Sequence, residues 1–176
     1  IAKFNLSVLL RKKGEVDRAN RLLNEASNEG VPQAQFNKTL TMDIKKQKKE
    51  IMALLKSSAD KGLIKACYMY GKYLHSDGDD NCLKYLEKAA ANGHDRAQLK
   101  CSQILKTSDP IRSRKYLESA KKTLPRAQKE YEDMIMNAKG DEPEQLYQQY
   151  IYLREKDPKA SFEPLSKSAA AKHVDA

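Results

Sequence analysis

The chain has 176 residues with a formal net charge of +9; 40% of the residues are hydrophobic and 32% are charged. It has no tryptophan and few glycines or prolines, a composition typical of an all-helical protein. No apolar run approaches the roughly 18 to 20 residues that a membrane-spanning helix needs, so we expect no membrane span. The three cysteines form no C-x-x-C pair, which argues against a disulfide framework and a zinc knuckle. Because the chain begins at Ile1 rather than at a methionine, we expect a fragment or a processed chain.

An alanine opens each unit of an internal repeat. These alanines recur every 30 to 33 residues, at Ala2, Ala34, Ala66, Ala97, Ala127 and Ala160. A period of about 30 to 40 residues is typical of a solenoid of helical hairpins, in which neighbouring hairpins bury a continuous core. We therefore predict an all-α solenoid of five hairpins over residues 1–160, with a capping helix or tail over 160–176. The predicted units are 1–33, 34–65, 66–96, 97–126 and 127–159.

In the first four units the first helix has a small residue at its sixth position, as in Ala66-Cys67-Tyr68-Met69-Tyr70-Gly71. Two helices of a hairpin approach to roughly 8 Å only where such a side chain is short. Gly71 and Ser102 meet this need. Glu132 does not, so we predict looser packing in the fifth hairpin.

The second helix of each unit carries a small residue, an apolar pair and then alanine, as in residues 82–89. This spacing places one apolar stripe on one helix face. A glycine follows the helix at Gly62 and Gly93, and we predict that it forms a left-handed C-cap. In the turn before residue 110, Asp109 is a predicted N-cap with Pro110 at the first helical position.

Two interpretations of the C-terminal part remain open. In one, residues 140–143 form a turn, residues 144–156 form the fifth second helix, and residues 157–162 open the capping helix. In that case Pro158 precedes Ala160 as Pro32 and Pro125 precede their alanines. In the other, Ala127 pairs with Ala176 and the period is broken.

Residues 66–71 and 89–97 (Ala-Ala-Ala-Asn-Gly-His-Asp-Arg-Ala) resemble the Sel-one-like repeat (SLR) family, relatives of the tetratricopeptide repeats. The resemblance covers residues 1–160, although these units are shorter than the family's and lack its tryptophan. It assigns structural roles to the repeat positions Ala34, Gly62, Ala66, Gly71, Ala89, Gly93, Ala97 and Ala127.

The resemblance implies a non-catalytic adaptor without a cofactor. Members of the family form right-handed superhelices whose concave surface, lined mostly by first helices, holds a partner protein or peptide. They occur in the cytosol, the endoplasmic reticulum lumen and the bacterial envelope, and we expect this chain in the cytoplasm.

A partner-binding surface is predicted from first-helix positions that hairpin packing does not use. These positions follow the small residue or lie at the end of each first helix: Val8, Arg11, Leu40, Lys72, His75, Gln103 and Lys106. The set mixes apolar and basic side chains, which suits an acidic or amphipathic segment.

No catalytic or metal-binding pattern is visible. The histidines are scattered, and we expect His94 to lie solvated in a turn. Residues 77–81 begin like a calcium loop, but Cys82 at position six and Lys88 at position twelve do not fit one. A turn that caps the next helix is the interpretation we adopt. Cys67, Cys82 and Cys101 are predicted to be small half-buried thiols, although one pair could bridge in an oxidising compartment.

The basic residues allow a second class of function. The run 45–49 and the basic units 34–65 and 97–126 suit a helical-repeat RNA-binding protein. The run lacks an interleaved aromatic for base stacking, and the unit 127–159 is acidic. We therefore predict a solvated lysine-rich turn and consider nucleic-acid binding the weaker hypothesis. A regulatory repeat domain of a larger enzyme or receptor is a third.

An aromatic cluster marks the last predicted hairpin. We interpret its residues as hairpin core, or as a docking patch if no capping helix covers them. The cluster consists of Tyr147, Tyr150, Ile151, Tyr152 and Leu153.

Overall fold

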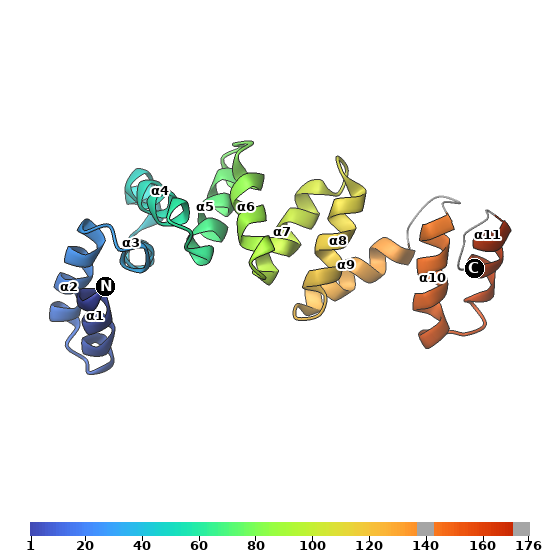
Figure 1. Cartoon of the computed structure of the whole chain (residues 1–176), viewed down its shortest axis with the longest axis horizontal. Helices are drawn as coiled ribbons and strands as arrows, with labels where there is room; N and C mark the ends of the chain where they lie inside the picture. Colours follow the sequence, from blue (N-terminus) through green and yellow to red (C-terminus); the bar gives the residue numbers. More distant parts are fainter. Residues whose placement is uncertain (137–142, 171–176) are drawn as a thin grey trace. The chain divides into compact units, whose positions relative to one another are not determined.

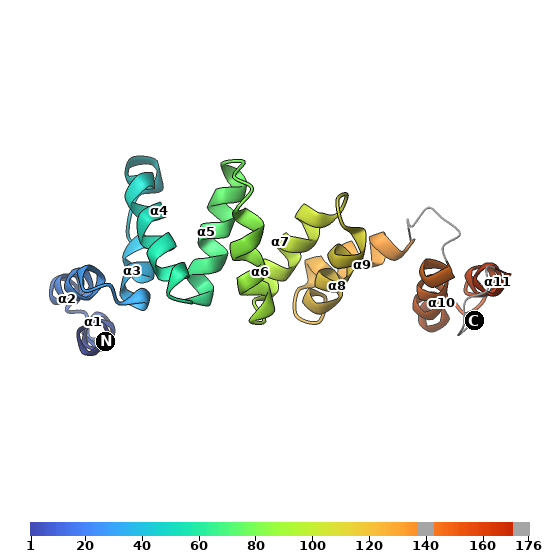
Figure 2. The same cartoon turned by 45° about the horizontal axis from the view of Figure 1, so that its top comes forward.

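The computed structural model describes residues 1–136 and 143–170, and within them the chain is all-α, as the sequence predicts (Figure 1). The chain divides into two compact units, residues 1–119 and 120–176. Figure 2 shows the helices of the first unit from a second direction, again following one another in chain order. Among the helices that the structure describes, none combines the length and hydropathy that crossing a bilayer requires.

The first unit is a solenoid of helical hairpins, each made of a first and a second helix joined by a short polar turn. Each of the first three second helices also packs on the first helix of the next hairpin, and the buried residues form two clusters, one over residues 23–34 and one over residues 51–101. The hairpins are α1 (Ala2–Lys12) with α2 (Val16–Asn28), α3 (Pro32–Thr39) with α4 (Ile44–Asp60), α5 (Ile64–Ser76) with α6 (Cys82–Ala91), and α7 (Asp95–Leu105) with α8 (Pro110–Ala120).

Three joints between hairpins share one backbone arrangement. At the joint after α6, the N–H of Gly93 donates to the carbonyl of Ala90 (3.0 Å) and the N–H of His94 donates to that of Ala89 (3.1 Å). This is the Schellman motif, which requires a left-handed residue that only glycine adopts without strain. The glycines at the three joints all have positive φ angles: Gly30 (77°), Gly62 (89°) and Gly93 (77°).

The joint after α8 has no glycine. There the N–H of Leu124 donates to the carbonyl of Ala120 (3.0 Å), and the paired bonds of the Schellman motif are replaced by this simpler closure. The division of the chain into its two units falls at this joint.

The small sixth position of the first helix lets α5 approach the backbone of α6. A Cβ added at Gly71 would lie 2.8 Å from Leu86 Cγ, 3.0 Å from the carbonyl oxygen of Cys82 and 3.1 Å from Leu86 N. In the next hairpin the approach is polar, because the hydroxyl of Ser113 donates to the buried carbonyl of Ser102 (2.8 Å).

Small side chains also line the faces between hairpins. The fully buried large side chains of the first unit include Leu55 and Leu86, one from each of two successive second helices. Around them the opening and closing alanines of the repeats let helices pack closely. Five of the repeat alanines are completely buried, whereas Ala2 and Ala160 are exposed; the buried ones are Ala34, Ala66, Ala89, Ala97 and Ala127.

The second unit contains α9 (Pro125–Met136), α10 (Pro143–Lys156) and α11 (Phe162–Ala170). Two side chains of α10 tie it to α9. Lys156 Nζ pairs with Glu132 Oε1 (2.9 Å), and Gln149 Nε2 donates to the carbonyl of Ile135 (2.7 Å). A long polar side chain at position 132 therefore makes an inter-helix ion pair where the other repeats have a small residue.

The lysine run is helical, which corrects our prediction of a turn. Residues 45–49 lie in α4, whose N-cap Asp43 accepts a hydrogen bond from the N–H of Lys45 (2.9 Å). An aspartate N-cap stabilises a helix that the lysine run itself favours. Gln47 departs from helical geometry (φ −124°, ψ 25°), so the helix is kinked within the run.

Two expectations about the C-terminal part are wrong. The last helix begins at Phe162 and not at the Pro158-x-Ala160 junction, because residues 158–161 form a turn in which Asp157 Oδ1 accepts from the N–H of Ala160 (3.3 Å). Among the α10 side chains that the structure describes, Leu146 is buried, while Ile151 is 41% exposed. The tyrosines and Leu153 of the cluster are half-buried, so the cluster is not a closed core.

Residues 137–142 and 171–176 lie outside the described residues. Most of the predicted turn over 140–143, the end of the predicted capping segment, His173 and the proposed pairing partner Ala176 all fall there.

His94 is half-buried, which corrects the expectation of a solvated turn residue. It is the N-cap of α7, where its Nδ1 accepts a hydrogen bond from the N–H of Ala97 (3.2 Å), and its ring stacks on Tyr68 (centroids 4.5 Å apart). Burial lowers the pKa of His94 below its usual 6.5, and this effect outweighs the opposing effects of a backbone hydrogen bond and of the charge of Asp95.

We expect the joint at His94 to weaken in mild acid. A lowered folded-state pKa means that the stabilisation is complete above about pH 6.5 and is lost as pH falls toward and through the folded value. Between about pH 7.5 and about pH 5.5, urea unfolding should show a loss of up to about 1 kcal/mol from this cap. In His94→Asn, whose amide caps without titrating, that part of the loss should disappear. An unchanged pH slope in the variant would contradict the assignment.

Gly71→Ala should destabilise the first unit. The added Cβ meets backbone atoms of α6, which cannot move without shifting that helix. Overpacking typically costs about 1–3 kcal/mol, more than the about 1 kcal/mol that alanine gains over glycine in a helix. Urea unfolding of the variant measures the difference. Lys72→Ala, at the next and exposed position, is the control and should change stability by less than about 0.5 kcal/mol. A Gly71→Ala protein as stable as the wild type would show that the helices have room to separate.

Candidate functional site

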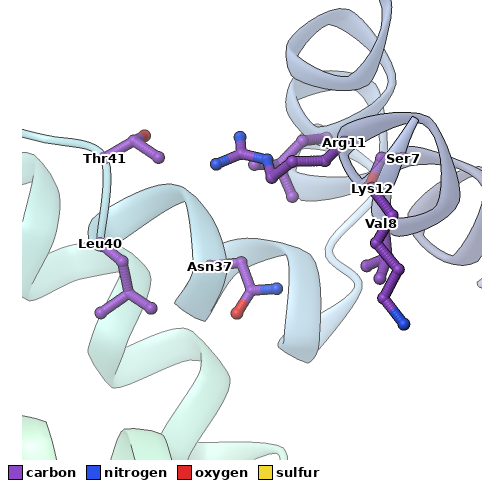
Figure 3. A pocket seen from close by; sticks show the side chains of 8 residues that line it. Ser7, Val8, Arg11, Lys12, Asn37, Leu40 and Thr41 are labelled. Atoms are coloured by element: carbon purple, nitrogen blue, oxygen red, sulfur yellow. The ribbon is translucent and has the colours of Figure 1, made fainter. Parts of the chain in front are cut away.

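A pocket of about 450 Å³ opens in the first unit where the first two hairpins meet. Figure 3 shows side chains of α1 reaching it from one side, and Asn37, Leu40 and Thr41 reaching it from the other. Its lining comes from α1, α2, α3 and the turn after α3: Ser7, Val8, Arg11, Lys12, Leu23, Asn37, Leu40 and Thr41.

The spacing of residues along α1 explains why several of its side chains line the pocket. Val8, Arg11 and Lys12 are three and four residues apart, so they share one face of the helix. The guanidinium of Arg11 is oriented by α2, because its Nη2 donates to the side-chain oxygen of Asn20 (2.6 Å).

The other side of the pocket is lined by residues that follow the end of α3, which is a short helix. The helix stops at Thr39, and the hydroxyl of Thr41 donates to the carbonyl of Lys38 (2.8 Å), which satisfies one of its last carbonyls. Leu40 and Thr41 therefore leave the helix and face the pocket from a turn. Leu40 is 61% exposed there, and Val8 on α1 is 37% exposed.

The pocket combines apolar surface with positive charge. Of its eight lining residues, Arg11 and Lys12 are cationic and none is acidic. Exposed leucine and valine side chains gain free energy when a partner covers them, by about 25 cal/mol per Å² of apolar surface. The arrangement therefore suits a ligand that carries an apolar side chain beside an anionic group.

The structure brings together three of the seven residues that we predicted to bind a partner, namely Val8, Arg11 and Leu40. The other four lie outside this pocket, on or just after helices of the third and fourth hairpins. Lys72 and His75 are exposed on α5, Gln103 is half-buried on α7, and Lys106 is exposed directly after α7.

Sequence reasoning missed five of the lining residues. Lys12 had a usable signal, since it follows Val8 by four residues on the same helix face, whereas Asn37 had none, because Leu40 lies after the end of α3. Leu23 had none, because it belongs to a second helix and its apolar spacing only indicates core. The remaining two are Ser7 and Thr41.

No group of three or more His, Cys, Asp or Glu residues in the described part of the chain could hold a metal ion. The turn 77–81 precedes α6, but its N-cap Asn81 makes no side-chain capping hydrogen bond, so the prediction that its side chains cap the helix is wrong. Asp79 Oδ1 accepts from both the backbone N–H and the side-chain amide of Asn81 (2.8 Å each), and these bonds lower the pKa of Asp79.

The cysteines are free and more deeply buried than we predicted. Cys67 and Cys101 are at most 1% exposed, and Cys82 is 7% exposed. Burial raises the pKa of all three thiols, that of Cys101 to about 12. Because the thiolate is the reactive form, these groups are inert at neutral pH and fill core space.

The sequence of the chain matches no family model and no curated protein. The structure is similar to a protective antigen of uropathogenic Escherichia coli strains that displays an SLR fold, with a TM-score of 0.66 at 15% identity over 99% of this chain. It is also similar to a Sel1 repeat protein from Oxalobacter formigenes, with a TM-score of 0.64 at 20% identity over 99% of this chain. The chain spans 42% of the length of the first protein and 74% of the second. Both structures show that this chain has the fold of the Sel1-like repeat proteins.

Proposed function

We propose that this protein is a non-catalytic scaffold that binds a partner protein or peptide on the first-helix surface of its first unit. The repeat architecture supports the proposal, since a solenoid arrays equivalent helices along one extended surface. The observation that carries it is the pocket, where Val8 and Arg11 of one hairpin meet Leu40 of the next.

Within this proposal the partner contributes an acidic or amphipathic segment. An apolar side chain of the segment covers Val8 and Leu40, and a carboxylate pairs with the guanidinium of Arg11, whose fork geometry suits such a group. Lys72, His75, Gln103 and Lys106 form the second part of the same binding surface.

We further propose five repeat units with a C-terminal cap over residues 160–176, and a cytoplasmic location. The three free cysteines support a reducing compartment, where thiols persist unpaired.

One observation favours RNA binding instead. Lys45, Lys46, Lys48 and Lys49 are all exposed on α4, although Lys48 is paired with Asp77 (2.5 Å). If this surface bound RNA, the logarithm of the affinity for mixed-sequence RNA would fall steeply and linearly with the logarithm of the salt concentration. A scaffold should show no such affinity at moderate ionic strength, and a salt titration separates the two.

The scaffold proposal is tested by panning a random peptide display library against the immobilised protein. Enriched peptides are synthesised, and their affinities are measured by fluorescence anisotropy. We expect Val8→Ser with Leu40→Ser to weaken them by about tenfold or more, since truncating a central apolar anchor costs over about 1–2 kcal/mol.

The matched control is Val16→Ser with Ile111→Ser. Val16 and Ile111 are aliphatic, like Val8 and Leu40, and are 50% and 71% exposed, but they lie on the second helices α2 and α8. Affinities should then stay within about twofold of the wild type. Equal losses in both double variants, or no loss in either, would overturn the assignment of the site.

A further inference from the structure

Helix α1 leaves one apolar face exposed. Figure 1 shows α1 and α2 at one end of the first unit, and α1 packs chiefly on α2. Ala2, Leu6 and Leu9 follow one another at intervals of four and three residues, so they share one face of the helix. Leu6 is 45% exposed, Leu9 is 57% exposed, and Ala2 is exposed as well. These three residues, which we call the α1 end face, do not line the pocket.

The same positions are covered in the third and fourth hairpins. In both hairpins the first two of the three positions are buried and the third is half-buried. They are Ala66, Tyr70 and Tyr73 on α5, and Ala97, Cys101 and Ile104 on α7. Unlike α1, helices α5 and α7 also pack on the second helix of the hairpin before them, α4 or α6. A helix of the second-helix kind is therefore what covers such a face.

The two covering helices share one apolar pattern. Each has three buried side chains four residues apart, in which the second is a leucine and the third is an alanine near the end of the helix. All of them belong to the buried cluster that also contains the covered positions of α5 and the first two of α7. They are Ile51, Leu55 and Ala59 on α4, and Cys82, Leu86 and Ala90 on α6.

A polar contact accompanies this packing at the end of each covering helix. The second residue of the unit donates to the carbonyl of the buried alanine. Cys67 Sγ donates to the carbonyl of Ala59 (3.5 Å), and Gln98 Nε2 donates to the carbonyl of Ala90 (3.2 Å). These donors satisfy carbonyls that the end of a helix leaves without partners in the helix itself.

Lys3 holds on α1 the position that Cys67 holds on α5. Its Nζ pairs with Glu25 (3.0 Å) and Glu29 (2.5 Å), and 44% of its side chain is exposed. An ammonium has three N–H donors, so Lys3 can also donate to a carbonyl at the end of a docked helix. Its charge suits that place, because the C-terminal end of a helix is the negative end of the helix dipole.

We propose that the α1 end face binds an amphipathic helix of a partner protein, which stacks on α1 as α4 stacks on α5. The partner helix carries the leucine and alanine pattern of α4 and α6. It runs antiparallel to α1, with its leucine against Leu6 and Leu9 and its last carbonyls at Lys3. This site is separate from the pocket and goes beyond the function proposed above.

A helix of another protein is a better occupant than a second copy of this chain. Helices α2, α4 and α6 already pack on α3, α5 and α7 within their own chain. A second copy would have to open its own stack of hairpins before it offered one of these faces. An amphipathic helix of a partner gains the burial of its apolar stripe without that cost.

The inference is tested with a fluorescein-labelled synthetic peptide of residues 44–62, which comprises α4 and the glycine after it and represents the partner helix. Its binding to the whole chain is measured by anisotropy. We expect Leu6→Glu with Leu9→Glu to weaken binding by about tenfold or more, because the docked helix would bury carboxylates without partners. Lys3→Ala should weaken it by about threefold, the effect of losing one hydrogen bond.

The matched control is Ile111→Glu with Ile151→Glu. It makes the same change in charge at two aliphatic positions of α8 and α10, which are 71% and 41% exposed. The affinity should stay within about twofold of the wild type. A peptide that carries Leu55→Glu should bind the wild-type chain at least about tenfold more weakly, because this leucine is the central apolar contact of the pattern.

Equal weakening by both double variants, or no binding to the wild type at up to about 1 mM peptide, would overturn the site. Loss of peptide binding in Val8→Ser with Leu40→Ser would assign the peptide to the pocket and would also overturn it. Sedimentation velocity tests the second copy: a dimer of the chain alone that Leu6→Glu with Leu9→Glu disrupts would overturn the partner assignment. The scaffold proposal is tested separately, since its panned peptides depend on Val8 and Leu40.

Discussion

At the C-terminal ends of the second helices, backbone carbonyls are left without partners inside their own helix, and the glycine turn and the next hairpin supply the donors. The carbonyl of Ala59 at the end of α4 accepts from the thiol of Cys67 on α5 (3.5 Å) and from Nζ of Lys88 on α6 (3.1 Å). A buried helix end needs such partners, and a lysine there also meets the negative end of the helix dipole. The stacking of hairpins in the first unit depends on these hydrogen bonds together with the glycine turn that precedes each new first helix.

The same joint determines where recognition can occur. Alanine, glycine and cysteine occupy the faces between hairpins, so these positions serve the packing of one hairpin on the next. What varies from one repeat to the next is the outer side of the first helices, and the pocket lies there. It forms at the second hairpin because α3 is only eight residues long, whereas α5 has thirteen. The positions equivalent to Leu40 and Thr41 remain helical in α5, so no comparable turn faces outward.

Charge and shape act together on this surface. Apart from Asp95 at the start of α7, the carboxylates of the unit lie on second helices and in turns, and several of them pair with lysines or arginines, among them Glu25 with Lys3 and Glu50 with Lys38. The first helices retain cations such as Lys72 without a partner in the described residues. Apolar side chains beside cations, as at the pocket, favour a ligand that presents both chemistries in one segment.

The sequence by itself determined the architecture, because the features that encode it are local. The helical apolar period and the glycine after α6 act within a few residues, and together with the recurring alanines they were sufficient to predict hairpins and joints, while the SLR fold was predicted from the resemblance of residues 66–71 and 89–97 to that family. Three lining residues of the pocket could also be predicted from the sequence. Val8, Arg11 and Leu40 occupy positions that hairpin packing does not use. Only the tertiary structure decided that they converge, that Leu23 of a second helix joins them, and that His94 is buried against Tyr68. Those outcomes depend on contacts between residues far apart in the chain and on where α3 ends, and no local pattern carries that information.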